Sequence, residues 1–179
     1  SRFFRDREVF RVLETSLLPA ITQDKKEGDL RIWSIGCASG EEPCSLALLW
    51  KNSFERNWPQ IHFSVLATDI DEKMLRRAEE GRYKKSSLRE TPQEILENSF
   101  NKEDGFFILN PSVRKSVEFK RHNILREEPF PGMDIIFCRN LAFTYFSKES
   151  QMKVLKKISS SLKEKGYLVI GRDESLPLT

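Results

Sequence analysis

Few residues in this chain are suited to binding a metal or to forming disulfides. The 179 residues include only two histidines, His62 and His122, and three cysteines, Cys37, Cys44 and Cys138. An odd number of cysteines without C-x-x-C spacing indicates neither a disulfide framework nor a zinc site, and so few histidines disfavour a histidine-based metal site. We therefore expect no bound metal and a reducing, cytoplasmic setting.

Long apolar runs and a strong net charge are also absent. No run approaches the ~20 apolar residues that span a bilayer, so we expect no membrane insertion. The net charge of +3 is too small to indicate nucleic acid as a partner. With 39% hydrophobic and 32% charged residues, the composition is typical of a folded globule. Residues 1–179 are expected to form a single domain, and the start at Ser1 indicates a piece of a longer protein.

Short apolar runs that alternate with amphipathic segments predict an α/β fold with a mostly parallel sheet and flanking helices. Buried strands are predicted at 31–35, 61–67, 133–137 and 167–170. Helices are predicted at about 8–18, 42–51, 71–81 and 147–166, with one more that begins near residue 91.

Local signals set the expected helix boundaries. Asp71 and Ser147 are suited to capping helix N-termini. The stretch Thr91-Pro92-Gln93-Glu94 combines a capping box with proline at the first helical position. Pro19 is expected to end the first helix, and residues 21–30 to form a loop. Two glycines are expected to end later helices, Gly81 and Gly166.

Residues 83–121 interrupt the alternation of strands and helices. We expect them to form a small β insertion rather than a separate domain. Besides the helix near residue 91, the pattern predicts short strands at 106–109 and 117–119, in a small antiparallel unit with a turn at Asn110-Pro111.

A turn rich in small residues, 36–40, follows the first predicted strand directly and opens a helix. Glycines such as Gly36 let the backbone approach a ligand in the crevice at the carboxyl ends of the strands. The dinucleotide pattern G-x-G-x-x-G is absent, and Glu41 and Glu42 place negative charge where a pyrophosphate would need a bare helix N-terminus. Such a turn suits a cationic ligand such as S-adenosylmethionine (SAM). Taken alone, it is equally consistent with glutamates that only complement the helix dipole.

Asp69 lies just past the second predicted strand, where a carboxylate can accept both ribose hydroxyls of a nucleoside. The alternative is a helix cap, but Asp71 is better placed for that role, which would leave Asp69 free. Together with the glycine turn, this favours a nucleoside ligand. Arg139 and Asn140 follow the strand at 133–137 and are expected to face the same crevice. Cys138 is expected to be a small core residue.

Several stretches, taken in order, form a specific combination. They are Ser1–Asp6, Arg31–Ser34 through Gly40–Pro43, Ala67–Asp71, Gly81–Tyr83, Val117–Phe119 with Asn123–Leu125, Phe137–Asn140 with Tyr145-Phe146, and Gly171–Glu174. The G-E-E-P and C-R-N stretches at this separation are the most specific pair. On these residues the chain resembles the CheR-type chemotaxis methyltransferases, which esterify protein glutamates.

The resemblance implies a Rossmann-like class I SAM-dependent methyltransferase fold, with SAM as the cofactor and S-adenosylhomocysteine (SAH) as the product. The site residues expected to bind the cofactor are Ser1, Arg5, Gly36, Glu42, Asp69, Asn123, Ile124, Arg139 and Asn140. Arg5 and Tyr145 are the implied catalytic residues. The chain departs from the family in having four residues instead of three between C-R-N and Y-F, and in Ser1, which replaces a threonine.

The implied partner is a protein substrate, a chemoreceptor-like helical protein that carries the target glutamates. The basic stretch at 76–89 is either a solvated face or an attractor for such an acidic helix. The segment at 100–121 is either a surface flap or a unit that docks a tail by strand addition. Two other functions remain open: SAM-dependent methylation of RNA or a small molecule, and SAM sensing without catalysis.

Overall fold

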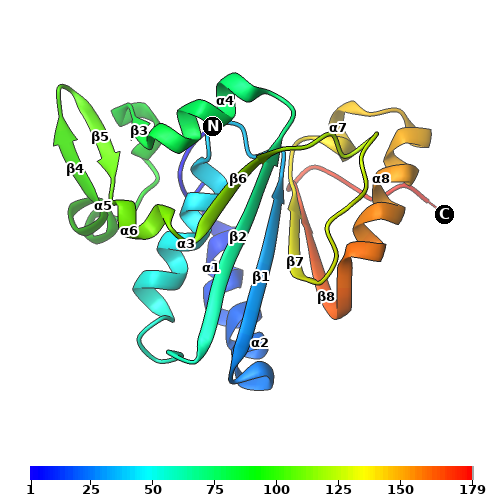
Figure 1. The fold of residues 1–179 in the computed structure, drawn as a ribbon, viewed down its shortest axis with the longest axis horizontal. Helices are drawn as coiled ribbons and strands as arrows, with labels where there is room; N and C mark the ends of the chain where they lie inside the picture. Colours follow the sequence, from blue (N-terminus) through cyan, green and yellow to red (C-terminus); the bar gives the residue numbers. More distant parts are fainter. Residues whose placement is uncertain (179) are drawn as a thin grey trace.

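A computed structural model describes residues 1–178, and a five-stranded parallel sheet lies at its centre (Figure 1). The strand order is β6–β2–β1–β7–β8, with bounds Val117–Arg121, Ile61–Asp69, Gly28–Ile35, Met133–Cys138 and Leu162–Ile170. β1 pairs with both β2 and β7. Its run from Ile32 to Ile35 is buried throughout, as expected for a central strand of a parallel sheet.

Helices lie on both sides of this sheet. They are α1 (Arg7–Val12), the π-helical turn η1 (Leu13–Leu17), α2 (Leu18–Lys25), α3 (Glu41–Ser53), α4 (Glu72–Glu80), α7 (Ala142–Tyr145) and α8 (Lys148–Ser161). In Figure 1, α1, α2 and α3 lie behind β1 and β2, and α8 lies beside β7 and β8. One buried apolar cluster therefore joins α1–α3 to the sheet, and a second joins α8 to the opposite face. Within residues 1–178, every helix is too short or too polar to cross a bilayer.

A small antiparallel sheet projects beside β6 (Figure 1). The segment comprises β3 (Arg82–Tyr83), the 3₁₀ turn η2 (Lys85–Leu88), α5 (Gln93–Ser99), β4 (Phe100–Glu103), β5 (Phe106–Leu109) and α6 (Pro111–Arg114). Its strands are ordered β3–β5–β4. The predicted α/β fold, with a mostly parallel sheet, flanking helices and a small β insertion, is confirmed.

The predicted extent of the small antiparallel unit was wrong at its C-terminal end. Residues 117–121 form β6, which pairs in parallel with β2 in the main sheet. The expected turn at Asn110 instead starts α6, because the Asn110 side chain accepts a hydrogen bond from the backbone N–H of Ser112. A short apolar run does not reveal the direction of the strand with which it will pair.

The prediction that Pro19 ends the first helix was also wrong. The helical path continues through Pro19 to Lys25, and β1 begins at Gly28. Proline lacks an N–H and clashes with the carbonyl four residues earlier in an ordinary helix. The wider turn Leu13–Leu17 comes directly before α2, so Pro19 falls in the first turn of α2, where a missing N–H is tolerated.

The predictions for two helix starts and one helix end are confirmed. The side chains of Asp71 and Ser147 each accept a backbone N–H from the first turn of the following helix. Gly81 ends α4 with a left-handed backbone, φ 63°.

The predicted capping box at Thr91 is not formed. The backbone N–H of Thr91 donates to the carbonyl of Leu88, so Thr91 closes η2 instead of opening α5. Its hydroxyl is buried and has no hydrogen-bond partner within residues 1–178. Pro92 occupies the position before α5 with an extended ψ of 137°.

The predicted end of α8 at Gly166 was wrong as well. The backbone is already extended at Leu162, ψ 137°, and Leu162 pairs with Met133. Gly166 therefore lies inside β8. The left-handed residue in this region is Lys165, with φ 62°, beside a register irregularity in the β7–β8 ladder.

Candidate functional site

The glycine turn predicted from the sequence joins β1 to α3 at the carboxyl edge of the main sheet. Gly36 and Gly40 have φ values of 74° and 88°, a region that glycine enters without strain. The backbone N–H groups of Gly36 and Cys37 donate to the carbonyl of Thr68 at 2.8 and 2.9 Å, which fixes the turn to the end of β2.

Asp71 rather than Asp69 caps α4, as expected, but the Asp69 carboxylate is hydrogen-bonded to this turn. Oδ2 accepts the N–H of Ala38 at 2.8 Å, and Oδ1 accepts the N–H of Asp71 at 2.9 Å. An ionised carboxylate has about four acceptor positions, so it retains capacity for two hydroxyl donors. The half-buried Asp69 thus links the glycine turn to the β2–α4 loop.

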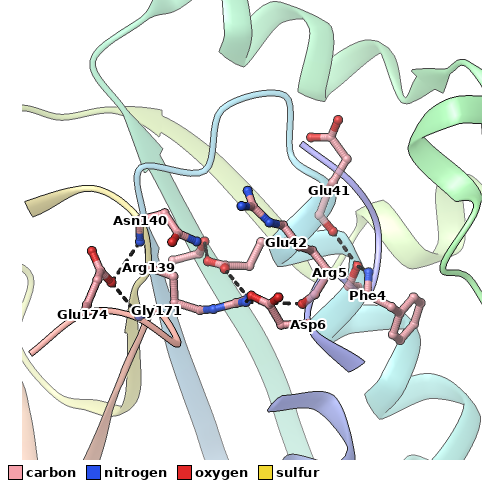
Figure 2. Close-up of polar contacts among 11 residues, drawn as sticks. Phe4, Arg5, Asp6, Glu41, Glu42, Arg139, Asn140, Gly171 and Glu174 are labelled. Carbon is pink, nitrogen blue, oxygen red and sulfur yellow. Dashed lines mark hydrogen bonds and ion pairs between the residues drawn. The ribbon is translucent and has the colours of Figure 1, made fainter. Parts of the chain in front are cut away.

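The two glutamates at the start of α3 point in different directions (Figure 2). Glu41 is buried, and its carboxylate accepts the Ser39 hydroxyl. Glu42 faces the ends of β1 and β7: Oε1 accepts the Ser34 hydroxyl at 2.8 Å, and Oε2 accepts Nη1 of Arg139 at 3.1 Å. Burial raises the pKa of the Glu42 carboxyl, and the guanidinium of Arg139 opposes that rise.

Arg139, at the end of β7, lies between two carboxylates (Figure 2). Its side chain is 3% exposed, and it forms ion pairs with Glu42 and with Asp6 of the N-terminal segment. Its Nε is buried and has no partner within the described part of the chain. A buried guanidinium whose Nε–H has no partner is suited to holding an acceptor oxygen of a ligand.

The carboxylate of Glu174 organises the loop after β7. It accepts the backbone N–H of Asn140 at 3.0 Å and also binds the N–H of Gly171 and the hydroxyl of Thr144. These contacts join the ends of β7 and β8 and hold Asn140 at φ 54° (Figure 2).

A cavity of about 190 Å³ opens among these groups. Its lining residues are Ser1, Arg2, Arg5, Phe10, Gly36, Cys37, Ala38, Glu42, Arg139 and Asn140. Larger hollows lie elsewhere, including one of about 350 Å³ over the middle of β1, β2 and β6. Ligands of open α/β sheets bind beyond the carboxyl ends of the strands, so position favours the smaller cavity.

The structure thus brings six of the predicted site residues together around one cavity, namely Ser1, Arg5, Gly36, Glu42, Arg139 and Asn140. Asp69 lies next to it through Ala38. Asn123 and Ile124 follow β6 and do not line it; the Asn123 side chain accepts the N–H of Leu125. Tyr145 is 75% exposed on α7 and does not line it either.

Sequence reasoning assigned no role to Asp6, Ser34 or Glu174, although each binds a predicted site residue. Asp6 is 133 positions from Arg139, and Glu174 is 34 from Asn140, so no local pattern joins them. Ser34 offered a signal, because it is a polar residue inside the apolar run of β1 and is completely buried.

The cysteines near the site are not activated nucleophiles. Cys37, Cys44 and Cys138 are free and buried, and burial raises the pKa of all three thiols, to about 12 for Cys44 and Cys138. We expect the native chain to resist Ellman's reagent near pH 8 for many minutes. All three should react in denaturant, where ordinary thiol pKa values return. Rapid labelling of any cysteine in the native chain would contradict this assignment.

Comparison with known proteins agrees with this geometry. Residues 1–179 match the family described as CheR methyltransferase, SAM binding domain. The chain is 36% identical over 176 residues to the chemotaxis protein methyltransferase of Listeria monocytogenes, covering 98% of this chain and 65% of the relative. It is 34% identical over 181 residues to that of Borreliella burgdorferi, covering 97% of this chain and 63% of the relative. The chain therefore spans slightly less than two thirds of the length of these relatives.

Solved structures resemble it in fold. An S-adenosylmethionine-dependent methyltransferase from Clostridium acetobutylicum superposes with a TM-score of 0.51 at 14% identity, covering 90% of this chain and 49% of that one. The predicted Rossmann-like class I methyltransferase fold is confirmed. On the family match, the chain belongs to the CheR methyltransferase SAM-binding domain family.

Proposed function

We propose that this chain binds SAM at the cavity beside the glycine turn and transfers its methyl group to glutamate side chains of a partner protein, releasing SAH. The observation that carries this proposal is the pairing of Glu42 with Arg139 at the carboxyl ends of β1 and β7. An anion and a cation side by side suit the ammonium and carboxylate of an amino acid, the group that ends the SAM molecule. In support, the curated relatives from Listeria and Borreliella are named chemotaxis protein methyltransferases.

The residues present are chemically suited to this cofactor. Glu42 would hold the ammonium, and the unpartnered Nε of Arg139 would donate to the carboxylate. Asp69, with acceptor capacity left on each oxygen, would hold the ribose hydroxyls. The other residues proposed to bind the cofactor are Ser1, Arg5, Gly36, Asn123, Ile124 and Asn140.

Bound SAM would supply a methyl group activated by the positive charge on sulfur. A glutamate acceptor is ionised near neutral pH and needs no strong general base, so the chain's task is alignment and exclusion of water. Arg5 is exposed at the cavity and would orient the acceptor carboxylate. Tyr145, also exposed, would contact the acceptor from α7 once the partner covers that face.

The proposed partner is an acidic helical protein of the chemoreceptor kind. Exposed basic residues on α4 and in the following segment support this choice: Arg76, Arg77, Arg82, Lys84, Lys85 and Arg89. Positive charge on one side of the site would attract a helix that carries several glutamates and would speed the encounter.

Two measurements test the proposal. Titration calorimetry with SAH is expected to show binding that falls about tenfold or more in Asp69→Asn, because charge-assisted hydrogen bonds to the sugar are weakened. Asp71→Asn is the matched control: it keeps the α4 cap and should leave affinity unchanged.

Methyl transfer from labelled SAM should then be measured with protein, RNA and metabolite fractions. We expect label in protein that alkali releases as methanol, because esters hydrolyse whereas N-methyl groups do not. Label in another fraction would exclude the glutamate acceptor, SAH binding without transfer would indicate a sensing module, and absence of SAH binding would refute the proposal.

A further inference from the structure

Among the hydrogen bonds and ion pairs of residues 1–178, the Asp6 side chain reaches the candidate site through Arg139. Its carboxylate accepts a hydrogen bond from Nη2 of Arg139, while Nη1 of the same guanidinium donates one to Oε2 of Glu42 at 3.1 Å (Figure 2). Glu42 and Arg139 line the cavity, whereas Asp6 does not. Asp6 therefore influences a bound molecule through the orientation of its neighbours.

The backbone that presents Asp6 is held in an unusual conformation. Asp6 and Phe4 have φ values of 62° and 52°, which non-glycine residues rarely adopt. Such strain persists only where the surroundings enforce it. Here Phe3 and Phe4 are buried, and the N–H of Phe4 donates to the Ser45 hydroxyl at 2.9 Å. The segment is thus fixed to the core and turns the Asp6 carboxylate toward the site.

Arg139 depends on Asp6 for much of its hydrogen bonding. Besides Asp6, Nη2 contacts only the carbonyl of Arg5, at 3.3 Å, among the hydrogen-bond partners in residues 1–178. A guanidinium that has lost its hydration needs well-placed anions to compensate. Without Asp6, Glu42 would be the one remaining anion among these partners, and the 3.3 Å contact with the Arg5 carbonyl would be the only other restraint on the guanidinium among the hydrogen bonds of residues 1–178.

We propose that Asp6 is a positioning residue that holds the Arg139 guanidinium against Glu42, so that both groups face the cavity in the orientation needed for the amino-acid end of SAM. This inference rests on the proposed function. It accounts for the strained backbone of the segment that carries Asp6, which is fixed to the core beside the site. It also accounts for a second carboxylate on Arg139, although Glu42 alone would neutralise that guanidinium.

The first test is SAH affinity of the whole chain by titration calorimetry. Asp6→Asn preserves shape and removes charge, and we expect affinity to fall about tenfold, with recovery of most of the loss in Asp6→Glu. Glu8→Gln is the matched control, because it removes a nearby carboxylate that pairs with the exposed Arg11. It should leave affinity unchanged.

The second test is the pH dependence of that affinity, which a purely structural role would not alter. The groups that face Glu42 directly or through Arg139 are Arg139, Arg5, Asp6, Cys37 and Cys138. Both thiols stay neutral because burial raises their pKa. The guanidinium of Arg139 is the main group that lowers the pKa of Glu42. If Asp6→Asn loosens that guanidinium, the pKa of Glu42 rises, so the acid limb of SAH binding, where binding is lost on acidification, should lie at a higher pH than in the wild type.

Each outcome decides something. Equal affinity in wild type and Asp6→Asn, with an unmoved acid limb, would overturn the positioning role and leave the proposed function intact. A wild-type chain that does not bind SAH would overturn the proposed function and this inference with it.

Discussion

Replacing Arg139 by glutamine is expected to lower the free energy of unfolding by about 3 kcal/mol near pH 7. The substitution leaves the carboxylates of Glu42 and Asp6, whose side chains are 19% and 31% exposed, without the guanidinium that pairs with both of them. Breaking a buried ion pair costs more than the pair contributes, because the remaining charge stays desolvated. Urea denaturation at fixed pH measures the loss.

The pH dependence of this loss identifies its cause. Burial raises the folded-state pKa of Glu42 above its ordinary value, and removal of Arg139 raises it further. The folded variant therefore binds protons more readily than the unfolded chain. The deficit should be fully present above the folded pKa of Glu42 and should shrink as pH falls through it.

A matched substitution distinguishes the effect of removing a buried arginine from that of removing an exposed one. Arg11→Gln removes an arginine that pairs with Glu8 on the exposed side of α1, and we expect no measurable change in stability. A deficit in Arg139→Gln that is equally small, or that does not vary with pH, would show that the two carboxylates are better hydrated than their burial indicates.

Replacing Gly40 by alanine is expected to destabilise the fold by about 3 kcal/mol, the sum of a strained φ and overpacking. Gly40 has φ 88°, and a Cβ there would lie 2.9 Å from Cβ of Ala78 and 3.1 Å from the Phe119 ring. Ala78 cannot rotate away, so α4 or the turn must move. The midpoint temperature of thermal unfolding should fall by about 6–12 °C for a chain of this length.

Gly28 supplies the control for this prediction. Its φ of 90° nearly equals that of Gly40, but a Cβ at Gly28 would meet nothing within 4 Å. Gly28→Ala should therefore cost only the conformational part, about 1–2 kcal/mol. Equal losses at the two positions would mean that close packing of the turn against α4 and β6 contributes nothing.

Features governed by neighbouring residues could be predicted from the sequence. The glycine turn, the Asp71 cap and the carboxyl ends of the strands all follow from residues within a few positions of one another. Those signals placed Gly36, Glu42 and Arg139 around one crevice, and the structure shows the same three side by side.

Features governed by tertiary contacts could not be predicted. β6 pairs with β2, and nothing in the short apolar sequence of β6 indicates that β2 is its partner. The contact of Asp69 with the glycine turn could not be predicted, because the N–H that it accepts belongs to Ala38, 31 positions away. Asp6 meets Arg139 only after the whole sheet has assembled.

The strand order has a consequence for how the chain is made. β1 takes one neighbour, β2, from the adjacent part of the sequence, but its other neighbour, β7, pairs Ile135 with Ile32. During synthesis, β1 and β2 emerge well before β7, so one edge of β1 has no partner strand until β7 has been made. Closing so large a loop is slow compared with forming local contacts. We expect chaperones to matter most while β7 has not yet paired with β1.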